Sequence, residues 1–176
     1  MKKLLSFGLM IMALCLQGCS TLQPTSYRQF SDDDVRNYRF FYVMPTGDKS
    51  GSSGGTYLYY GYGVGYASTA AKSINPGDLI CGYLMGEGMV RAENVNNLPG
   101  NTVLISYGET GVRRPAGLGY TIEVMIQFIN AETHDVICTV TGEGIGDTEA
   151  DDVRIAVTRC LDTIFHPERI TNKGTN

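Results

Sequence analysis

Few residues of this chain combine a reactive side chain with the spacing that catalysis requires. Its two histidines are His134, in a polar turn-forming stretch, and His166, directly before Pro167. Neither belongs to a local motif that would pair an imidazole base with a serine or cysteine nucleophile. A catalytic group would have to be assembled from distant segments, so we expect a protein that is not an enzyme and that holds no cofactor.

A glycine-rich stretch from Gly142 to Asp147 has the composition of a phosphate-binding loop. It lacks the Gly-Lys-Ser/Thr of a P-loop and the spacing of a dinucleotide-binding turn. Glu143 and the acidic residues that follow offer oxygen ligands for Ca²⁺, but their spacing is not that of an EF-hand loop. Acidic residues are also expected where a helix starts, because they interact with its dipole. We interpret the stretch as a strand end that leads into a helix capped by Asp147 or Thr148, without a metal.

The chain has five cysteines, of which Cys15 and Cys19 lie in the N-terminal region. The other three, Cys81, Cys138 and Cys160, show neither a Cys-x-x-Cys spacing nor the spacing of metal ligands. Each has apolar neighbours, among which a free cysteine packs as a small hydrophobic residue. We favour three buried thiols, and the alternative is one disulfide with one free thiol.

The strongest candidate for binding is a segment over 56–66 that is rich in tyrosine and glycine. In one continuous strand, the large residues at even positions from Leu58 to Tyr66 would face away from the glycines between them. Tyrosine rings suit protein interfaces and stacking on sugars, and glycine allows close backbone approach. The same rings could instead fill the protein's own core, and both interpretations stay open. The candidate partner-binding residues are Tyr57, Tyr59, Tyr60, Tyr62 and Tyr66.

Apolar patterning predicts the strands that would position these groups. A first strand over 39–44 is rich in aromatic residues and stops at Pro45, and a second covers 102–107. A hairpin follows, with strands over 120–129 and 136–141 that a polar connection joins.

Two helices are predicted from their caps and apolar stripes. Asn75 followed by Pro76 is typical of a helix start, and this helix ends near Gly86. The other helix begins at Thr148 and ends before Pro167. Its apolar stripe consists of Val153, Ala156, Val157, Cys160, Leu161, Ile164 and Phe165. Together the elements predict an α+β fold, a two-layer sandwich of a mixed four- to five-stranded sheet with two helices on one face.

The N-terminus has the layout of a secretory signal. Lys2 and Lys3 precede an apolar run that ends at Leu16 and is too short to span a bilayer comfortably. Leu16, Gly18 and Cys19 resemble the lipobox of bacterial lipoproteins. The resemblance implies cleavage after Gly18 and acylation of Cys19, and several acyl chains on one residue give stable anchoring. The alternative is a plain secretory signal.

These features divide the chain into four expected segments. They are a lipoprotein signal peptide over 1–18, a lipidated tether over 19–37, a single α/β domain over 38–166 and a C-terminal tail over 167–176. The formal net charge of the whole chain is −4, and the signal carries away two lysines and no acidic residue. Because no run of basic residues remains, we expect no nucleic-acid partner. The pair Arg113–Arg114 is interpreted as a solvated turn.

The order of elements from Tyr38 to Phe165 resembles a broad group of small outer-membrane lipoproteins of α/β fold. That group includes auxiliary lipoproteins of envelope transport machines. The resemblance implies a non-catalytic structural or adaptor role, through an envelope protein partner or self-association. An insertion over 50–66 departs from the compact pattern, and use of its part from Tyr57 to Tyr66 as a glycan or cell-wall binding surface is the alternative function. Ser20, rather than an acid, follows Cys19, which resembles sorting to the outer membrane, and we expect the protein to face the periplasm.

Overall fold

The computed structural model describes residues 22–45, 57–59, 62–64, 75–116 and 119–171. Its main layer is a six-stranded sheet in the order β1-β10-β9-β6-β2-β5. Strands β1, β10, β9 and β6 pair antiparallel, whereas β2 pairs parallel to both β6 and β5. The strands of this sheet are β1 (Ser26–Gln29), β2 (Phe40–Val43), β5 (Val90–Arg91), β6 (Thr102–Glu109), β9 (Ile122–Asn130) and β10 (Val136–Gly144).

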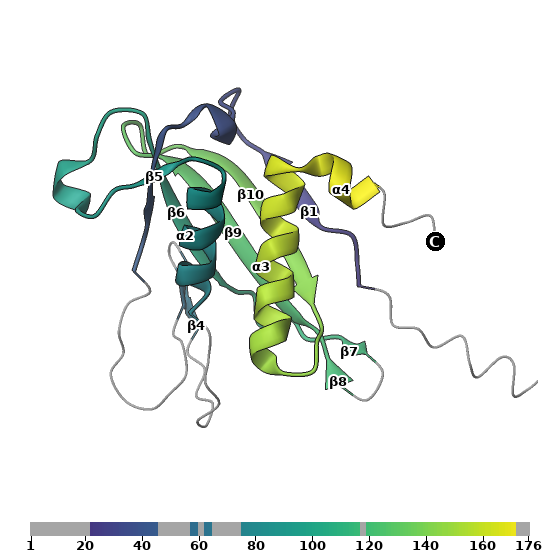
Figure 1. The fold of residues 1–176 in the computed structure, drawn as a ribbon. Helices are drawn as coiled ribbons and strands as arrows, with labels where there is room; N and C mark the ends of the chain where they lie inside the picture. Colours follow the sequence, from purple (N-terminus) through teal and green to yellow (C-terminus); the bar gives the residue numbers. More distant parts are fainter. Residues whose placement is uncertain (1–21, 46–56, 60–61, 65–74, 117–118, 172–176) are drawn as a thin grey trace, which may run out of the picture.

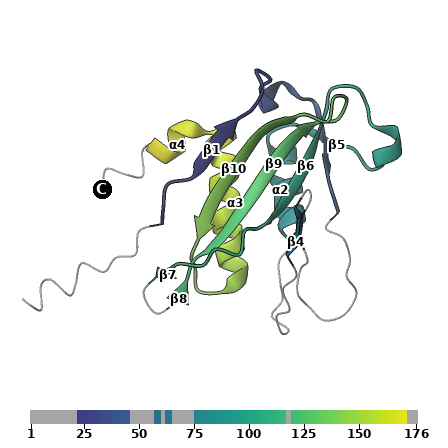
Figure 2. The same cartoon turned by 180° about the vertical axis from the view of Figure 1, so that it is seen from behind.

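Two helices cover one face of this sheet, as Figure 1 shows. They are α2 (Pro76–Gly86) and α3 (Glu149–Phe165), and a short helix, α4 (Pro167–Thr171), follows in what we expected to be the tail. In the view from behind, none of the described helices crosses the opposite face (Figure 2). The α+β class with a mixed sheet is confirmed. The expected number of strands is too low, because the edge strands β1 and β5 are short and have no apolar alternation.

Four smaller elements complete the described part of the chain. Two of them are two-stranded antiparallel hairpins, and two are single turns of 3₁₀ helix that connect larger elements. They are the hairpin of β3 (Tyr57–Tyr59) with β4 (Tyr62–Val64), the hairpin of β7 (Pro115–Ala116) with β8 (Gly119–Tyr120), and the turns η1 (Val35–Asn37) and η2 (Val95–Asn97).

The core lies between the sheet and the two helices. Its largest fully buried side chains are Phe41, Phe128, Ile80, Leu84, Ile105, Ile122, Ile126, Ile137 and Leu161. Ile122, Val124, Ile126 and Phe128 of β9 all face this core, as the alternation of the sequence predicts. The apolar stripe of α3 packs against β9 and β10.

Both helix starts are confirmed in detail. The side chain of Asn75 accepts a hydrogen bond from the Gly77 backbone N–H, and Thr148 accepts one from the Asp151 N–H. Glycine then sets how closely α3 approaches β10. A Cβ atom built on Gly144 would lie 1.8 Å from the carbonyl oxygen of Asp152, inside the helix backbone. The strand end that the sequence predicts at this position is therefore also the contact surface for the helix.

The N-terminal segment differs from the tether that we expected over 19–37. Residues 26–29 form β1, which pairs along its length with residues 138–141 of β10. Further on, Val35 is buried in the core. Every side chain of β1 is classed as exposed, so no apolar pattern identifies this strand, and its backbone hydrogen bonds join it to the sheet.

No helix within the described residues is both long and apolar enough to cross a membrane.

Candidate functional site

Some of the residues predicted to form a binding or lipidation site lie among the described residues, and others do not. Gly18 and Cys19, and two of the tyrosines, Tyr60 and Tyr66, lie outside the described residues. The remaining tyrosine candidates belong to the β3–β4 hairpin, with Tyr57 and Tyr59 in β3 and Tyr62 in β4.

The segment over 56–66, for which a single strand was one possibility, contains this hairpin instead. Tyr59 pairs with Tyr62, and Leu58 pairs with Gly63. A large residue and a glycine therefore share a register position, whereas one continuous strand would have placed them on different sides. In space β3 lies beside β6, the central strand of the sheet that joins its parallel and antiparallel parts.

The sheet face without helices, called here the helix-free face, is more apolar than a solvated sheet surface. Leu104 and Ile129 are paired neighbours on β6 and β9, and they are buried although neither belongs to the core under the helices. Half-buried Phe40 and Tyr42 extend this face onto β2, and Met125 extends it along β9. Alternation along each strand places all five side chains opposite the core residues.

A buried amide lies in the middle of the helix-free face. Gln127 is 9% exposed, and Ser106, which pairs with it across the strands, is 3% exposed. The Gln127 Nε2 group donates to Thr139 Oγ1 over 3.4 Å, but its Oε1 atom has no hydrogen-bond partner. A buried carbonyl oxygen without a donor is costly, by about 1–3 kcal/mol.

The charged groups nearest the N-terminus form a second cluster, the N-terminal clamp, made of Gln23, Arg114, Glu143 and Arg159. The Arg114 guanidinium binds the carboxylate of Glu143, whose side chain is only 5% exposed. The Gln23 N–H donates to Glu143 Oε2 at 2.9 Å, and Arg159 Nη2 donates to the Gln23 carbonyl oxygen at 2.7 Å. The hydrogen bonds from the Arg114 side chain are the main cause that holds the pKa of Glu143 below its usual value, and the bond from the Gln23 N–H acts in the same direction.

The N-terminal clamp corrects the interpretation of one residue, Arg114. Arg114, which we expected in a solvated turn, binds a buried carboxylate 29 positions further along the chain. Glu143, one of the acids considered for Ca²⁺, is thereby occupied by a protein cation. Asp151, another of those acids, binds Thr148 and Arg154 at the start of α3. Within the described segments, no three side chains of the metal-binding types form a group that could hold an ion.

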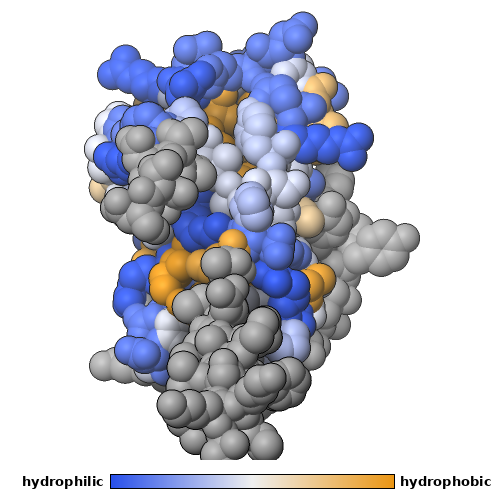
Figure 3. Space-filling model, turned by 90° about the vertical axis from the view of Figure 1, so that its right-hand side faces the viewer, coloured by the Kyte–Doolittle hydropathy of each residue, from blue (hydrophilic) through white to orange (hydrophobic). Residues whose placement is uncertain are grey.

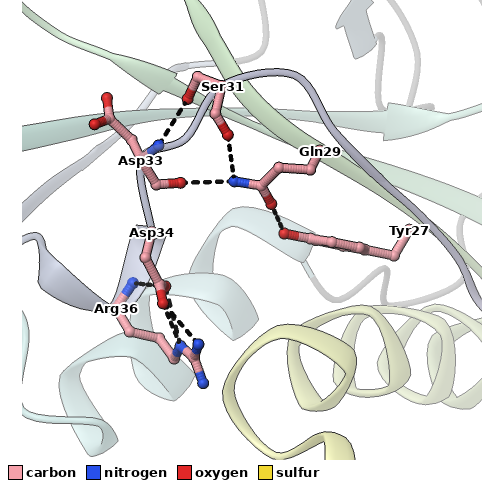
Figure 4. A network of polar contacts seen from close by, with 6 residues as sticks. All are labelled: Tyr27, Gln29, Ser31, Asp33, Asp34 and Arg36. Carbon is pink, nitrogen blue, oxygen red and sulfur yellow. Dashed lines mark hydrogen bonds and ion pairs between the residues drawn. The ribbon is translucent and has the colours of Figure 1, made fainter.

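A hollow of about 450 Å³ lies between β1, the loop that follows it and the end of α3. Figure 4 shows its polar network, in which Gln29 Nε2 donates to the backbone oxygens of Ser31 and Asp33. Asp34 accepts from Arg36, at 2.6 Å from Nη2, and this bond lowers the pKa of the carboxyl. The network binds the loop from β1 to β2 in one conformation, and its carboxylate at Asp34 is already neutralised.

The remaining titratable groups hold structural positions. His166 Nε2 is 2.8 Å from Glu87 Oε1, which links the end of α3 to the end of α2. His134 has a positive φ of 63° in the β9–β10 turn. The free thiols Cys81, Cys138 and Cys160 are all buried, as we favoured. Burial raises the pKa of Cys138 and of Cys160 to about 12, the opposite of what a reactive thiol requires.

Exposed apolar side chains occur outside the helix-free face as well. Figure 3 shows apolar groups between hydrophilic ones on the side of the molecule where β1 and α4 lie. The exposed large apolar residues are Tyr27, Phe30, Met85, Val90, Val95, Val112 and Tyr120.

No family model and no curated protein matches this chain. Among solved structures, a PelC variant from Paraburkholderia phytofirmans, a dodecamer, is 14% identical, with a TM-score of 0.45 over 80% of this chain and 96% of that chain. Another PelC dodecamer from the same bacterium is also 14% identical, with a TM-score of 0.43 over 80% and 97%. A PDZ domain protein from Parabacteroides distasonis is 10% identical, with a TM-score of 0.43 over 89% of this chain and 36% of that chain. These similarities assign no activity to the chain.

Sequence reasoning missed the N-terminal clamp and the buried amide of Gln127. The clamp joins residues near 23, 114, 143 and 159, and no local spacing connects such positions. A polar residue inside the alternating strand over 120–129 was the only available signal for Gln127, and alternation alone indicates an outward side chain, not a buried one.

Proposed function

We propose that the protein is a lipid-anchored lipoprotein of the cell envelope that acts as a non-catalytic structural or adaptor module facing the periplasm. The observation that carries this proposal is the helix-free face. Its partly accessible side chains, Phe40, Tyr42 and Met125, are apolar and lie on neighbouring strands around buried Leu104 and Ile129. The anchor is inferred from the lipobox-like residues Leu16, Gly18 and Cys19.

Apolar side chains around a few specific polar groups are typical of protein interfaces. The helix-free face has this composition. The tyrosine-bearing β3–β4 hairpin lies beside β6, one of the strands that form this face. A non-catalytic role is supported by the partners of the titratable groups. His166, Glu143 and Asp34 are each held by protein side chains.

The alternative is binding of glycan or cell wall through the tyrosine-rich segment. Tyrosine rings stack on sugars, and Tyr57, Tyr59 and Tyr62 are close in the hairpin register. The two functions use the same region of the molecule, so one experiment can distinguish them.

We would place a photoreactive amino acid at Tyr62 and irradiate living cells. A matched variant carries the same amino acid at Gly82, an exposed position of α2 with no atom within 4 Å of an added Cβ. An adaptor predicts discrete protein adducts from Tyr62 and not from Gly82. Self-adducts alone would indicate an oligomer, and glycan fragments on Tyr62 would favour the alternative.

Equal labelling at the two positions, or none at Tyr62, would refute a binding role of the hairpin. The anchor has its own test. Replacement Cys19→Ala should release the protein from isolated membranes, and unchanged membrane association would contradict the lipoprotein assignment.

A further inference from the structure

The N-terminal clamp limits how far the folded body can lie from its anchor. Gln23 is bound through its N–H to Glu143 and through its carbonyl oxygen to Arg159. Only four residue steps separate it from Cys19. A fully extended chain covers at most about 3.6 Å per residue, so Cys19 lies no further than about 14 Å from Gln23. The segment that links the folded domain to Cys19 is therefore much shorter than the tether that we expected over 19–37.

The N-terminal clamp also determines which part of the body lies nearest the anchor. Arg114, which forms an ion pair with Glu143, directly precedes the β7–β8 hairpin. The Thr121 N–H donates to the Arg114 carbonyl oxygen at 2.8 Å, and Pro115 pairs with Tyr120. Hydrogen bonds thus connect Gln23 continuously to the hairpin. Figure 1 shows β7, β8 and the first described residues at the same side of the molecule.

This part of the surface presents apolar side chains to solvent. Tyr120 is 61% exposed and Val112 is 47% exposed. Tyrosine is favoured at the membrane–water interface, where its ring and hydroxyl group meet different environments. The nearby Arg113 lies 3.2 Å from Glu109, and Arg114 is bound to Glu143, so both arginines already have acidic partners. The surface is thus suited to contact with lipid through its apolar side chains rather than through charge.

Phe30, another exposed aromatic residue near the N-terminus, fits less well. Phe30 is 52% exposed, but it lies at the far end of β1, seven residues beyond Gln23. At about 3.3 Å per residue that strand leads roughly 23 Å away from the clamp. Asp32 and Asp33 lie shortly after Phe30 in the chain, and an anionic lipid surface would repel them.

We propose that the surface formed by Val112 and the β7–β8 hairpin lies on the phospholipid headgroups of the membrane that holds Cys19. This inference rests on the proposed lipid anchor and adds an orientation to it. The body is held against the membrane by one edge, and η2, which lies on the far side of the molecule in both ribbon views, points away from it. The sheet then stands across the membrane surface.

The test measures the distance of single labels from lipid. Val112→Cys and Tyr120→Cys carry a fluorescent label on the full lipidated protein, and Val95→Cys in η2 is the matched control, because Val95 is 50% exposed and Val112 is 47% exposed. The protein is reconstituted into vesicles of phosphatidylethanolamine and phosphatidylglycerol, with a quencher on the headgroup. A domain of this size is roughly 35 Å across, so we expect quenching at Val112 and Tyr120 to exceed that at Val95 at least about threefold.

A second variant tests directly whether the short segment between Cys19 and Gln23 holds the domain near the membrane. Inserting a flexible glycine–serine linker of about 12 residues after Ser20 adds a mean reach of roughly 20 Å without touching the clamp. We expect quenching at Val112 to fall to the level at Val95 in this variant. Equal quenching at all three positions in the parent protein, or no effect of the linker, would overturn the orientation.

Failure of the anchor itself gives a different result. Mass measurement of the N-terminal peptide shows whether Cys19 carries acyl chains, and co-flotation with vesicles shows whether the protein binds them. An unmodified peptide and no flotation would refute the lipoprotein proposal. A modified peptide with equal quenching at Val95 and Val112 would refute only the proposed orientation of the domain on the membrane.

Discussion

Replacing Gly144 by alanine should separate α3 from the sheet. A Cβ atom at this position would lie 1.8 Å from the Asp152 carbonyl oxygen and 2.7 Å from the Ala156 nitrogen, both in the backbone of α3. Carbon and oxygen atoms without a bond need about 3.5 Å, so the helix would have to move by roughly 1.5 Å. No side-chain rotation can relieve this contact, because the neighbouring atoms belong to a helix backbone.

The size of the effect follows from what α3 covers. Its buried side chains include Val153, Ala156 and Leu161, which pack on β9 and β10. A gap of 0.5–1 Å already removes about a quarter to a half of the dispersion energy between facing atoms. Overpacking of a core commonly costs about 1–3 kcal/mol. Because a whole helix must move, we expect Gly144→Ala to lower the free energy of unfolding by at least about 3 kcal/mol.

The assay is thermal unfolding of the detergent-purified protein, followed by circular dichroism. A loss of about 3 kcal/mol corresponds to a decrease in Tm of roughly 6–12 °C for a chain of this length. Gly82→Ala is the matched control, because a Cβ added there meets no atom within 4 Å. Within helix α2 this exchange should stabilise by about 0.5–1 kcal/mol. A Tm of Gly144→Ala within about 2 °C of the parent would refute the close packing of α3 on β10.

Three further predictions concern the helix cap, the N-terminal clamp and the thiols. Thr148→Ala should cost about 1 kcal/mol, because the Asp151 N–H loses the side-chain oxygen that accepts from it, and urea unfolding measures this loss. The pKa of Glu143 is lowered in the folded protein, so its contribution is present above the usual glutamate pKa of about 4.3 and lost as pH falls through the folded value. Glu143→Gln should therefore lower Tm at pH 7, and this difference should shrink as the pH falls below about 4.3, so a decrease that is equal at every pH would contradict this. A thiol reagent should react slowly with the native protein and rapidly in denaturant at Cys81, Cys138 and Cys160, whereas fast native labelling would show that they are accessible.

Local patterns in the sequence predicted the elements that the structure contains at the centre of the fold. Asn75 and Thr148 cap their helices as expected, because a cap depends on residues within one turn. The alternation from Ile122 onward was sufficient for the buried face of β9, since strand periodicity is a local property. The three thiols are buried for the same reason, as their neighbours on the chain are apolar.

The candidate surfaces depended on contacts that no local pattern contains. β1 joins the sheet through its backbone and keeps all of its side chains exposed, so composition indicated a tether where the fold has an edge strand. The hairpin β3–β4 arises from pairing between residues that a single strand would have separated.

The sequence by itself determined the lipobox-like N-terminus, the helix caps and the apolar faces, because each depends on residues within a few positions of one another. Only the tertiary structure decided that Gln23 is bound by Glu143 and Arg159 and that Gln127 is buried. Those features depend on residues brought together from distant parts of the chain, and their partners become defined only when the sheet and α3 pack together.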